Sequence, residues 1–226
     1  MPIEPCGPVE TREPPRTEGK MIRWARLYDL GTTLLPFGRA SLLRRRITEL
    51  AEVAPGSRIL DVGCGPGRLA ILAATIAGPS GEICGIDPAP EMIALARENA
   101  TRAGVGIHFE VGVIEALPYP EDRFDLVLSS LMLHHLPDTL KRRGLAEVRR
   151  VLRPGGCFFA VDFGATPRGG MGHLLCILGL RKGSDHAERV RDIVQEAGFS
   201  RPEIGPVGQR GLMFIRGWKP AANAPP

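Results

Sequence analysis

The sequence predicts a doubly wound α/β fold: a mostly parallel seven-stranded sheet with an antiparallel hairpin at one edge and a helical cap at the N-terminus. Apolar runs alternate with segments of helical period between residues 58 and 163, which is the rhythm of repeated βα units. The runs at 126–128 and 157–161 are apolar at every position, as in parallel strands buried on both faces. A length of 226 residues suits one such domain, which we expect to cover residues 20–219.

Strands are expected where apolar runs stop at glycine, proline or aspartate, at residues 58–62, 82–86, 107–111, 124–129 and 157–161, with 203–207 and 212–217 as the edge hairpin. Helices are expected where apolar residues recur three or four positions apart, at residues 20–30, 37–51, 68–77, 139–152 and 185–197. One further helix should begin at a proline after Asp87 and end at Gly104. The first two helices belong to the cap, residues 20–54.

Three segments do not follow this rhythm. Residues 1–19 are rich in proline and charge, and residues 220–226 in alanine and proline, so we expect two disordered tails. Residues 163–183 are rich in glycine around an apolar centre and are expected to form a lid or insertion at the sheet edge. Three interpretations of that insertion are open: the wall of an apolar pocket, an interfacial patch in peripheral contact with membrane lipid, or a helix packed on the sheet.

Charge and cysteine content argue against several classes of protein. Lys and Arg number 29 against 25 Asp and Glu, and this excess of +4 is smaller than a dedicated nucleic-acid binder usually carries. Five cysteines without C-x-x-C spacing indicate neither a disulfide framework nor structural zinc, which favours a cytoplasmic protein. The N-terminus lacks a secretory-signal pattern, and the longest apolar stretch outside the sheet, residues 171–180, is too short to span a bilayer. We expect a monomer or homodimer.

A glycine-rich loop between the first strand and its helix predicts a nucleotide-like ligand, because Gly63, Gly65 and Gly67 allow close backbone approach and the helix presents free N–H groups. Two ligands fit. The sequence from Gly65 satisfies G-x-G-x-x-A and Asp87 lies where a ribose-binding acid is expected, which favours a nicotinamide dinucleotide. Asp61, however, would place a negative charge near a pyrophosphate, whereas an ammonium or sulfonium would suit it. Asp87 could also serve only as a helix N-cap.

Four segments, residues 59–67, 85–92, 115–125 and 152–156, resemble in order and spacing the motifs of class I S-adenosylmethionine-dependent methyltransferases. The lead-in at 26–29, with Gly38 and the arginines near 44, is similar to quinone-biosynthesis C-methyltransferases and bacterial phospholipid N-methyltransferases. The resemblance implies a Rossmann-like fold, S-adenosyl-L-methionine as cofactor and S-adenosyl-L-homocysteine as product.

The resemblance also implies cofactor-binding residues, with Asp61 near the methionine amino end, Asp87 on the ribose hydroxyls, and Pro88 with Met92 beside the adenine. The full set is Asp61, Gly63, Cys64, Gly65, Gly67, Asp87, Pro88, Met92, Val113, Ile114, Glu115 and Ser129. The family usually carries Gly-Asp-Ala-Glu where this chain has Gly112-Val-Ile-Glu. Side-chain recognition of the adenine amino group is therefore not expected at Val113, and Ile114 is either a wall of the adenine site or plain core.

Candidate catalytic groups are His134 and His135, which follow the fourth predicted parallel strand, and Tyr28 in the cap. A neutral imidazole near pH 7 is a suitable base, although a His-His-Leu segment also serves packing or loop shape in related enzymes. Asp162 is a further pocket candidate, and no third ligand at suitable spacing supports a metal site. We expect a methyltransferase for a small apolar or amphiphilic acceptor such as a quinone, phenol or lipid. The alternatives are a non-catalytic module that binds the same cofactor and an NAD(P)-dependent oxidoreductase.

Overall fold

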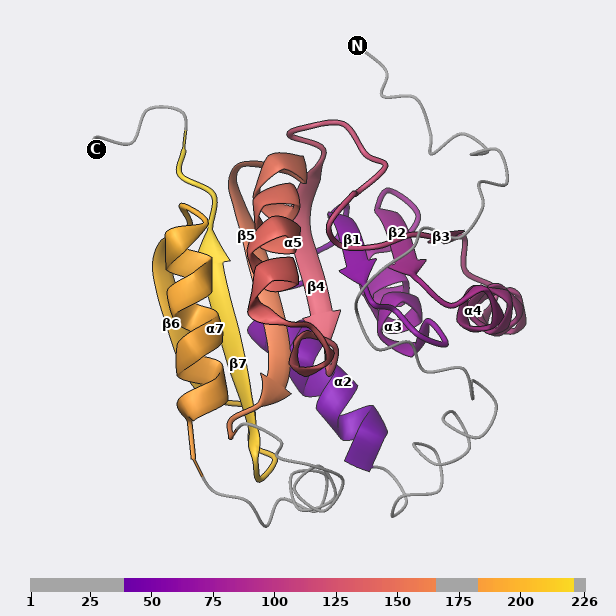
Figure 1. The fold of residues 1–226 in the computed structure, drawn as a ribbon. Helices are drawn as coiled ribbons and strands as arrows, with labels where there is room; N and C mark the ends of the chain where they lie inside the picture. Colours follow the sequence, from indigo (N-terminus) through magenta and orange to yellow (C-terminus); the bar gives the residue numbers. More distant parts are fainter. Residues whose placement is uncertain (1–38, 166–182, 222–226) are drawn as a thin grey trace.

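The computed structural model describes residues 39–165 and 183–221 (Figure 1). The expected tail at 1–19, most of the expected tail at 220–226, the first cap helix with Tyr28, and most of the insertion at 163–183 lie outside these residues. The described part contains the whole predicted sheet, including the edge at which the parallel strands end.

Seven strands form one sheet in the order β3-β2-β1-β4-β5-β7-β6. All neighbours pair in parallel except β7, which is antiparallel to both β5 and β6. The predicted mostly parallel sheet with an antiparallel edge hairpin is therefore confirmed. The strands are β1 (Arg58–Val62), β2 (Glu82–Asp87), β3 (His108–Val111), β4 (Phe124–Ser130), β5 (Leu152–Phe163), β6 (Ser200–Pro206) and β7 (Leu212–Trp218).

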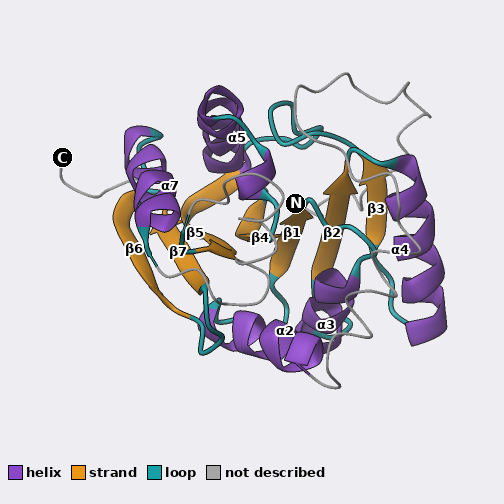
Figure 2. Ribbon diagram, turned by 60° about the horizontal axis from the view of Figure 1, so that its bottom comes forward, coloured by secondary structure: helices purple, strands orange, loops and turns teal. Residues whose placement is uncertain are grey.

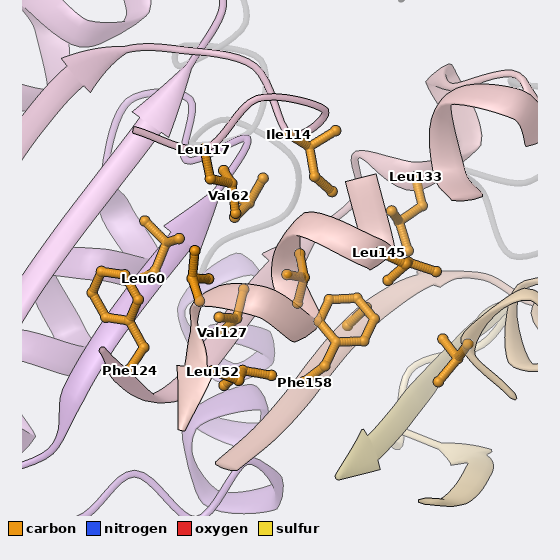
Figure 3. Close-up of a cluster of buried hydrophobic side chains, with 14 of the residues drawn as sticks. Leu60, Val62, Ile114, Leu117, Phe124, Val127, Leu133, Leu145, Leu152 and Phe158 are labelled. Carbon is orange, nitrogen blue, oxygen red and sulfur yellow. The ribbon is translucent and has the colours of Figure 1, made fainter. Parts of the chain in front are cut away.

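Helices cover both faces of the sheet, as Figures 1 and 2 show. One face packs against α2 (Arg39–Leu50), α3 (Arg68–Ala77) and α4 (Pro90–Ala103) through a cluster that includes Ile47, Leu69 and Ile93. The other face packs against α5 (Asp138–Val151) and α7 (Asp185–Glu196) through a second cluster, part of which is drawn in Figure 3. Burial on both faces explains why the central strands are apolar at nearly every position.

Glycine and proline set the helix boundaries that the sequence predicted. Pro90 occupies the first turn of α4, where its missing N–H costs nothing, and Gly104 ends that helix in the left-handed conformation with φ 68°. Gly78 ends α3, also at φ 68°. The helices expected at 68–77 and 185–197 and the strand expected at 58–62 agree with the structure to within one residue.

The start of β5 differs from the prediction. The segment Leu152-Arg-Pro-Gly-Gly was expected to end a helix ahead of a strand at 157–161, but β5 already pairs with β4 at Leu152, opposite Phe124. The register shifts before Leu126 meets Cys157, so the proline and glycines lie in a bulge, where a strand tolerates them. Because β5 extends to Phe163, Asp162 is a strand residue. A short 3-10 helix, η1 (Leu133–His135), was not predicted either.

Within residues 39–165 and 183–221, no helix has the length and apolar character needed to cross a membrane. Cys64, Cys84 and Cys157 are free thiols.

Candidate functional site

The candidate site lies at the edge where the parallel strands end. β1 pairs with β2 in register, with Val62 opposite Ile86, so the two strands end side by side. The glycine loop, residues 63–67, follows β1 at this edge, and Asp87 is the last residue of β2. Open α/β sheets bind their ligands beyond the carboxyl ends of the strands, so a ligand is expected at this edge.

Backbone hydrogen bonds tie the glycine loop to the end of β2. The N–H groups of Gly63 and Cys64 both donate to the carbonyl oxygen of Ile86, over 2.8 and 2.9 Å. The N–H of Gly65 donates to Oδ2 of Asp87 over 2.9 Å. These three hydrogen bonds therefore fix the loop conformation against β2.

The carboxylate of Asp87 is held by two backbone donors, because Oδ1 accepts from the N–H of Ala89 over 2.9 Å while Oδ2 accepts from Gly65. Burial raises the pKa of Asp87, and these two hydrogen bonds partly oppose the rise. Each carboxylate oxygen can accept more than one hydrogen bond, so the group retains acceptor capacity toward a ligand. Two fixed acceptor oxygens suit the neighbouring hydroxyls of a ribose.

The three glycines of the loop have different surroundings, although all adopt positive φ. A Cβ on Gly67 would stand 2.7 Å from the Phe109 ring and 3.0 Å from Cβ of Ala96, so this glycine allows α4 and β3 to pack close to the loop. A Cβ on Gly63 would stand 2.5 Å from Cγ of Met132. At Gly65 no atom of the described residues lies within 4 Å of that position. Gly65 is therefore where a ligand can approach the backbone most closely.

Asp61 is a buried carboxyl group beside the loop. It is 1% exposed, and no residue in the described ranges donates a hydrogen bond to its Oδ2. Burial raises the pKa of Asp61 to about 7; a hydrogen bond from the backbone of Ala70 lowers it, and the charge of Asp87 raises it further. An unsatisfied buried carboxylate oxygen fits a cationic group such as an ammonium and does not fit a pyrophosphate.

The residues predicted for the adenine side are mostly buried. Met92 lies in a small apolar cluster with Ala89 at the start of α4. Val113 is buried and forms a β-bridge with Ala116. Ile114 packs against α5, where a Cβ on Gly144 would stand 2.7 Å from its Cγ1, and Figure 3 draws it within the cluster on that face. The side chain of Ile114 thus serves the core, and the cofactor contacts of these residues remain predictions. Pro88 and Glu115 are half-buried next to them.

The end of β5 holds His134 in a fixed orientation. Nδ1 of His134 lies 2.6 Å from Oδ1 of Asp162, and the backbone N–H of His134 donates to Oδ2 over 2.9 Å. His186, at the start of α7, places Nε2 3.9 Å from Oδ2 of the same carboxylate. Burial alone would raise the pKa of Asp162, but the hydrogen bonds of His134 and electrostatic attraction from both histidines hold the pKa below its ordinary value.

Of the other candidate catalytic residues, His135 lies next to His134, and Tyr28 falls outside the described residues. The rings of His135 and His134 have centroids 3.9 Å apart. Ser129 is buried near the end of β4, and its hydroxyl has no hydrogen-bond partner within residues 39–165 and 183–221. The same part of the chain contains no group of three potential metal ligands.

Sequence reasoning missed three residues that shape the site: Met132 against Gly63, His186 at Asp162, and Asn99, whose side chain donates to the carbonyl oxygen of Pro66. Asn99 did have a sequence signal. It occupies the inward face of α4 together with Ile93 and Ala96, and a polar residue there must find a buried partner.

Comparison with known proteins agrees with this geometry. A family model described as a methyltransferase domain matches residues 59–156. The chain is 38% identical over 145 residues to a demethylmenaquinone methyltransferase of Thermus thermophilus, covering 64% of each protein. It is 33% identical over 172 residues to an arsenite methyltransferase of Halobacterium salinarum, covering 74% of this chain and 43% of that one. A ubiquinone/menaquinone biosynthesis C-methyltransferase of Hydrogenovibrio crunogenus is 27% identical over 217 residues, with 85% of each covered.

The first two of these relatives are matched over less than two thirds of their length. Among solved structures, a SAM-dependent methyltransferase from Aquifex aeolicus aligns with a TM-score of 0.64 at 19% identity, covering 84% of this chain and 97% of that one. At this identity the likeness concerns the fold alone.

Proposed function

Because this chain belongs to the class I S-adenosylmethionine-dependent methyltransferases, we propose that it transfers a methyl group from S-adenosylmethionine to a small apolar or amphiphilic acceptor, such as a quinone or phenol. The observation that carries this proposal is the Asp87 carboxylate, fixed at the tip of β2 by Gly65 and Ala89. A ribose placed there would direct the amino-acid arm of the cofactor along the glycine loop and the adenine toward Pro88 and Met92.

Asp61 supports a cationic ligand in preference to a dinucleotide. Its buried, unsatisfied Oδ2 lies beside the loop, where an ammonium of the amino-acid arm would satisfy it directly or through water. A pyrophosphate at the same place would bring two like charges together in a poorly solvated site. The charge arrangement therefore favours S-adenosylmethionine over NAD.

Methyl transfer requires mainly that the acceptor atom be aligned with the methyl group of the cofactor. S-adenosylmethionine supplies a methyl group that is already activated by the sulfonium, so the chain has to hold the acceptor atom in line with that methyl. A general base is needed only where the acceptor loses a proton. His134 is the best placed candidate among the described residues, because Asp162 fixes its ring at the end of β5, and His135 lies next to it.

The thiols of the described residues favour an organic acceptor over arsenite, the substrate named for the Halobacterium relative. Trivalent arsenic prefers thiolate ligands, as soft metals do. Cys64 and Cys84 are buried in different elements, and burial raises the pKa of Cys64 and raises that of Cys157 to about 12. Cys64 and Cys157 are therefore thiols at neutral pH, and the described residues contain no group of three potential metal ligands. The quinone substrates named for the other relatives are therefore the better guide.

The test combines binding with turnover. Isothermal titration should show binding of S-adenosylhomocysteine, and incubation with S-adenosylmethionine plus a reduced naphthoquinone, a simple phenol or a phospholipid should release S-adenosylhomocysteine with at least one of them. Absence of any binding would contradict the proposal. Binding without release from any acceptor would instead support a non-catalytic module, and thermal protection by NAD but not by S-adenosylmethionine would support an oxidoreductase.

A further inference from the structure

Asn99, in the second half of α4, holds the glycine loop at its centre. Its Nδ2 donates to the carbonyl oxygen of Pro66 over 2.8 Å, joining residues 33 positions apart in the chain. Its Oδ1 accepts from Nη1 of Arg102 over 2.9 Å. Asn99 is only 3% exposed and its bond to Pro66 is buried, whereas the bond from Arg102 lies partly at the surface.

The two partners of Asn99 determine which residue can stand there. A carbonyl oxygen requires a donor and a guanidinium requires an acceptor, and a side-chain amide offers one of each. Aspartate would turn a carboxylate oxygen toward the carbonyl of Pro66, and leucine would offer neither group. Either replacement leaves the buried carbonyl oxygen without its donor, which costs more than the bond itself contributes.

Inside the loop the N–H of Gly67 donates to the carbonyl oxygen of Cys64 over 3.0 Å, and Asn99 adds a side-chain contact at the residue between two glycines. Pro66 lies between Gly65 and Gly67, which adopt φ 50° and 74°, and glycine populates many other conformations equally well. Asp87 accepts a hydrogen bond from the N–H of Gly65, and Asn99 donates one to the carbonyl oxygen of the following residue, Pro66. The two contacts thus hold the segment from opposite ends, and Asn99 is the one that is buried.

We propose that Asn99 is a positioning residue for the methyl-donor site, which holds the glycine loop in the conformation that receives the amino-acid half of the cofactor. This inference rests on the proposed function, because it assumes that the loop faces that half of S-adenosylmethionine. Asn99 acts through Pro66 and does not touch the ligand. Its loss should therefore weaken ligands that extend over the loop and spare ligands that end before it.

Two ligands separate this role from a general effect on folding. S-adenosylhomocysteine carries both halves of the cofactor product, whereas 5′-methylthioadenosine keeps the adenosine and lacks the amino acid. Asn99→Leu and Asn99→Asp should each raise the Kd of S-adenosylhomocysteine about tenfold, the effect of one unsatisfied buried group. The Kd of 5′-methylthioadenosine should change by less than about threefold, so the ratio of the two constants shifts.

Arg102→Met is the matched control. It removes the other partner of Asn99 from the same helix and leaves the bond to Pro66 in place, and Arg102 is itself largely exposed. Both dissociation constants should stay within about twofold of the wild type. An unchanged ratio in both Asn99 variants, with or without a lower melting temperature, would overturn the inference. Failure of the wild type to bind S-adenosylhomocysteine would instead overturn the proposed function, and the inference with it.

Hydrogen exchange provides a readout that needs no ligand. If Asn99→Leu does not fold, Asn99→Ser leaves a small polar side chain that cannot reach Pro66. In either variant the amides of Gly65 and Gly67 should exchange faster than in the wild type, while the amides of β1 exchange as before. Unchanged exchange in the loop would show that Asn99 does not position it.

Discussion

Nδ1 of His134 lies 2.6 Å from Oδ1 of Asp162, and the backbone N–H of the same histidine donates to the other carboxylate oxygen. One buried carboxylate at the end of β5 therefore fixes both the backbone and the ring of a residue in η1. Because His186 approaches the same group from α7, Asp162 also links η1 to that helix. The proposed acceptor side of the site thus depends on a single charged residue that has no exposed surface.

Asp162→Asn should destabilise the protein by about 3 kcal/mol at pH 7, because it leaves buried imidazoles without their carboxylate. The pKa of Asp162 is lowered in the folded state, so its contribution is present above the pKa of the unfolded chain, about 4, and is lost as the pH falls toward the folded value. Urea unfolding across pH should show the gap between wild type and variant narrowing below about pH 4. A gap that is constant with pH would contradict the assigned charge state.

Asp61→Asn should show the opposite pH dependence. The pKa of Asp61 is raised to about 7, so its favourable contribution is complete below the unfolded pKa of about 4 and is lost as the pH rises through the folded value. The variant should therefore be more stable than the wild type at pH 8, by up to about 4 kcal/mol, and similar to it near pH 4. It should also bind S-adenosylhomocysteine more weakly at pH 8, where the wild-type carboxylate is charged and attracts the ammonium of the ligand. Urea unfolding and isothermal titration test the two statements separately, and a stability difference that does not grow with pH would contradict the first.

Asp87→Ala should raise the Kd of S-adenosylhomocysteine about tenfold or more, because it removes a charged acceptor and frees the N–H of Gly65. Glu91→Ala is the control, since this carboxylate lies in the first turn of α4, is exposed, and makes no hydrogen bond to the loop within the described residues. Isothermal titration of both variants makes the comparison. Equal affinity in Asp87→Ala and wild type would remove the main support for the ribose site.

Local signals in the sequence predicted the frame of this site. Gly104 ends α4 in a left-handed conformation, and the three loop glycines indicate a turn between strand and helix. Both features are determined by a few neighbouring residues, so the sequence predicts them. The bond from Asn99 to Pro66 and the approach of His186 to Asp162 are tertiary contacts, which no local pattern specifies. The prediction for residues 152–156 was wrong because Arg-Pro-Gly-Gly has the composition of a turn. In the structure this segment lies within β5, at the point where the register with β4 shifts.

The sequence does not show that the three glycines of the loop have different surroundings, because their neighbours come from distant parts of the chain. Alanine at Gly65 and at Gly67 should therefore have different effects. Gly67→Ala places a methyl group against Phe109 and Ala96 and should lower stability by about 3 kcal/mol, from overpacking added to left-handed strain. Gly65→Ala meets no described atom and should cost only the strain, about 1 kcal/mol, but its methyl group projects where the ligand would lie.

Gly104→Ala isolates the strain, because Gly104 at the end of α4 is left-handed with φ 68° and has equally open surroundings among the described residues. Gly65→Ala and Gly104→Ala should lose similar stability in urea, and only the former should lose affinity for S-adenosylhomocysteine. If both bind it as the wild type does, the ligand does not approach the loop at Gly65. If both lose affinity equally, the loss follows from backbone strain and not from occupation of the ligand site.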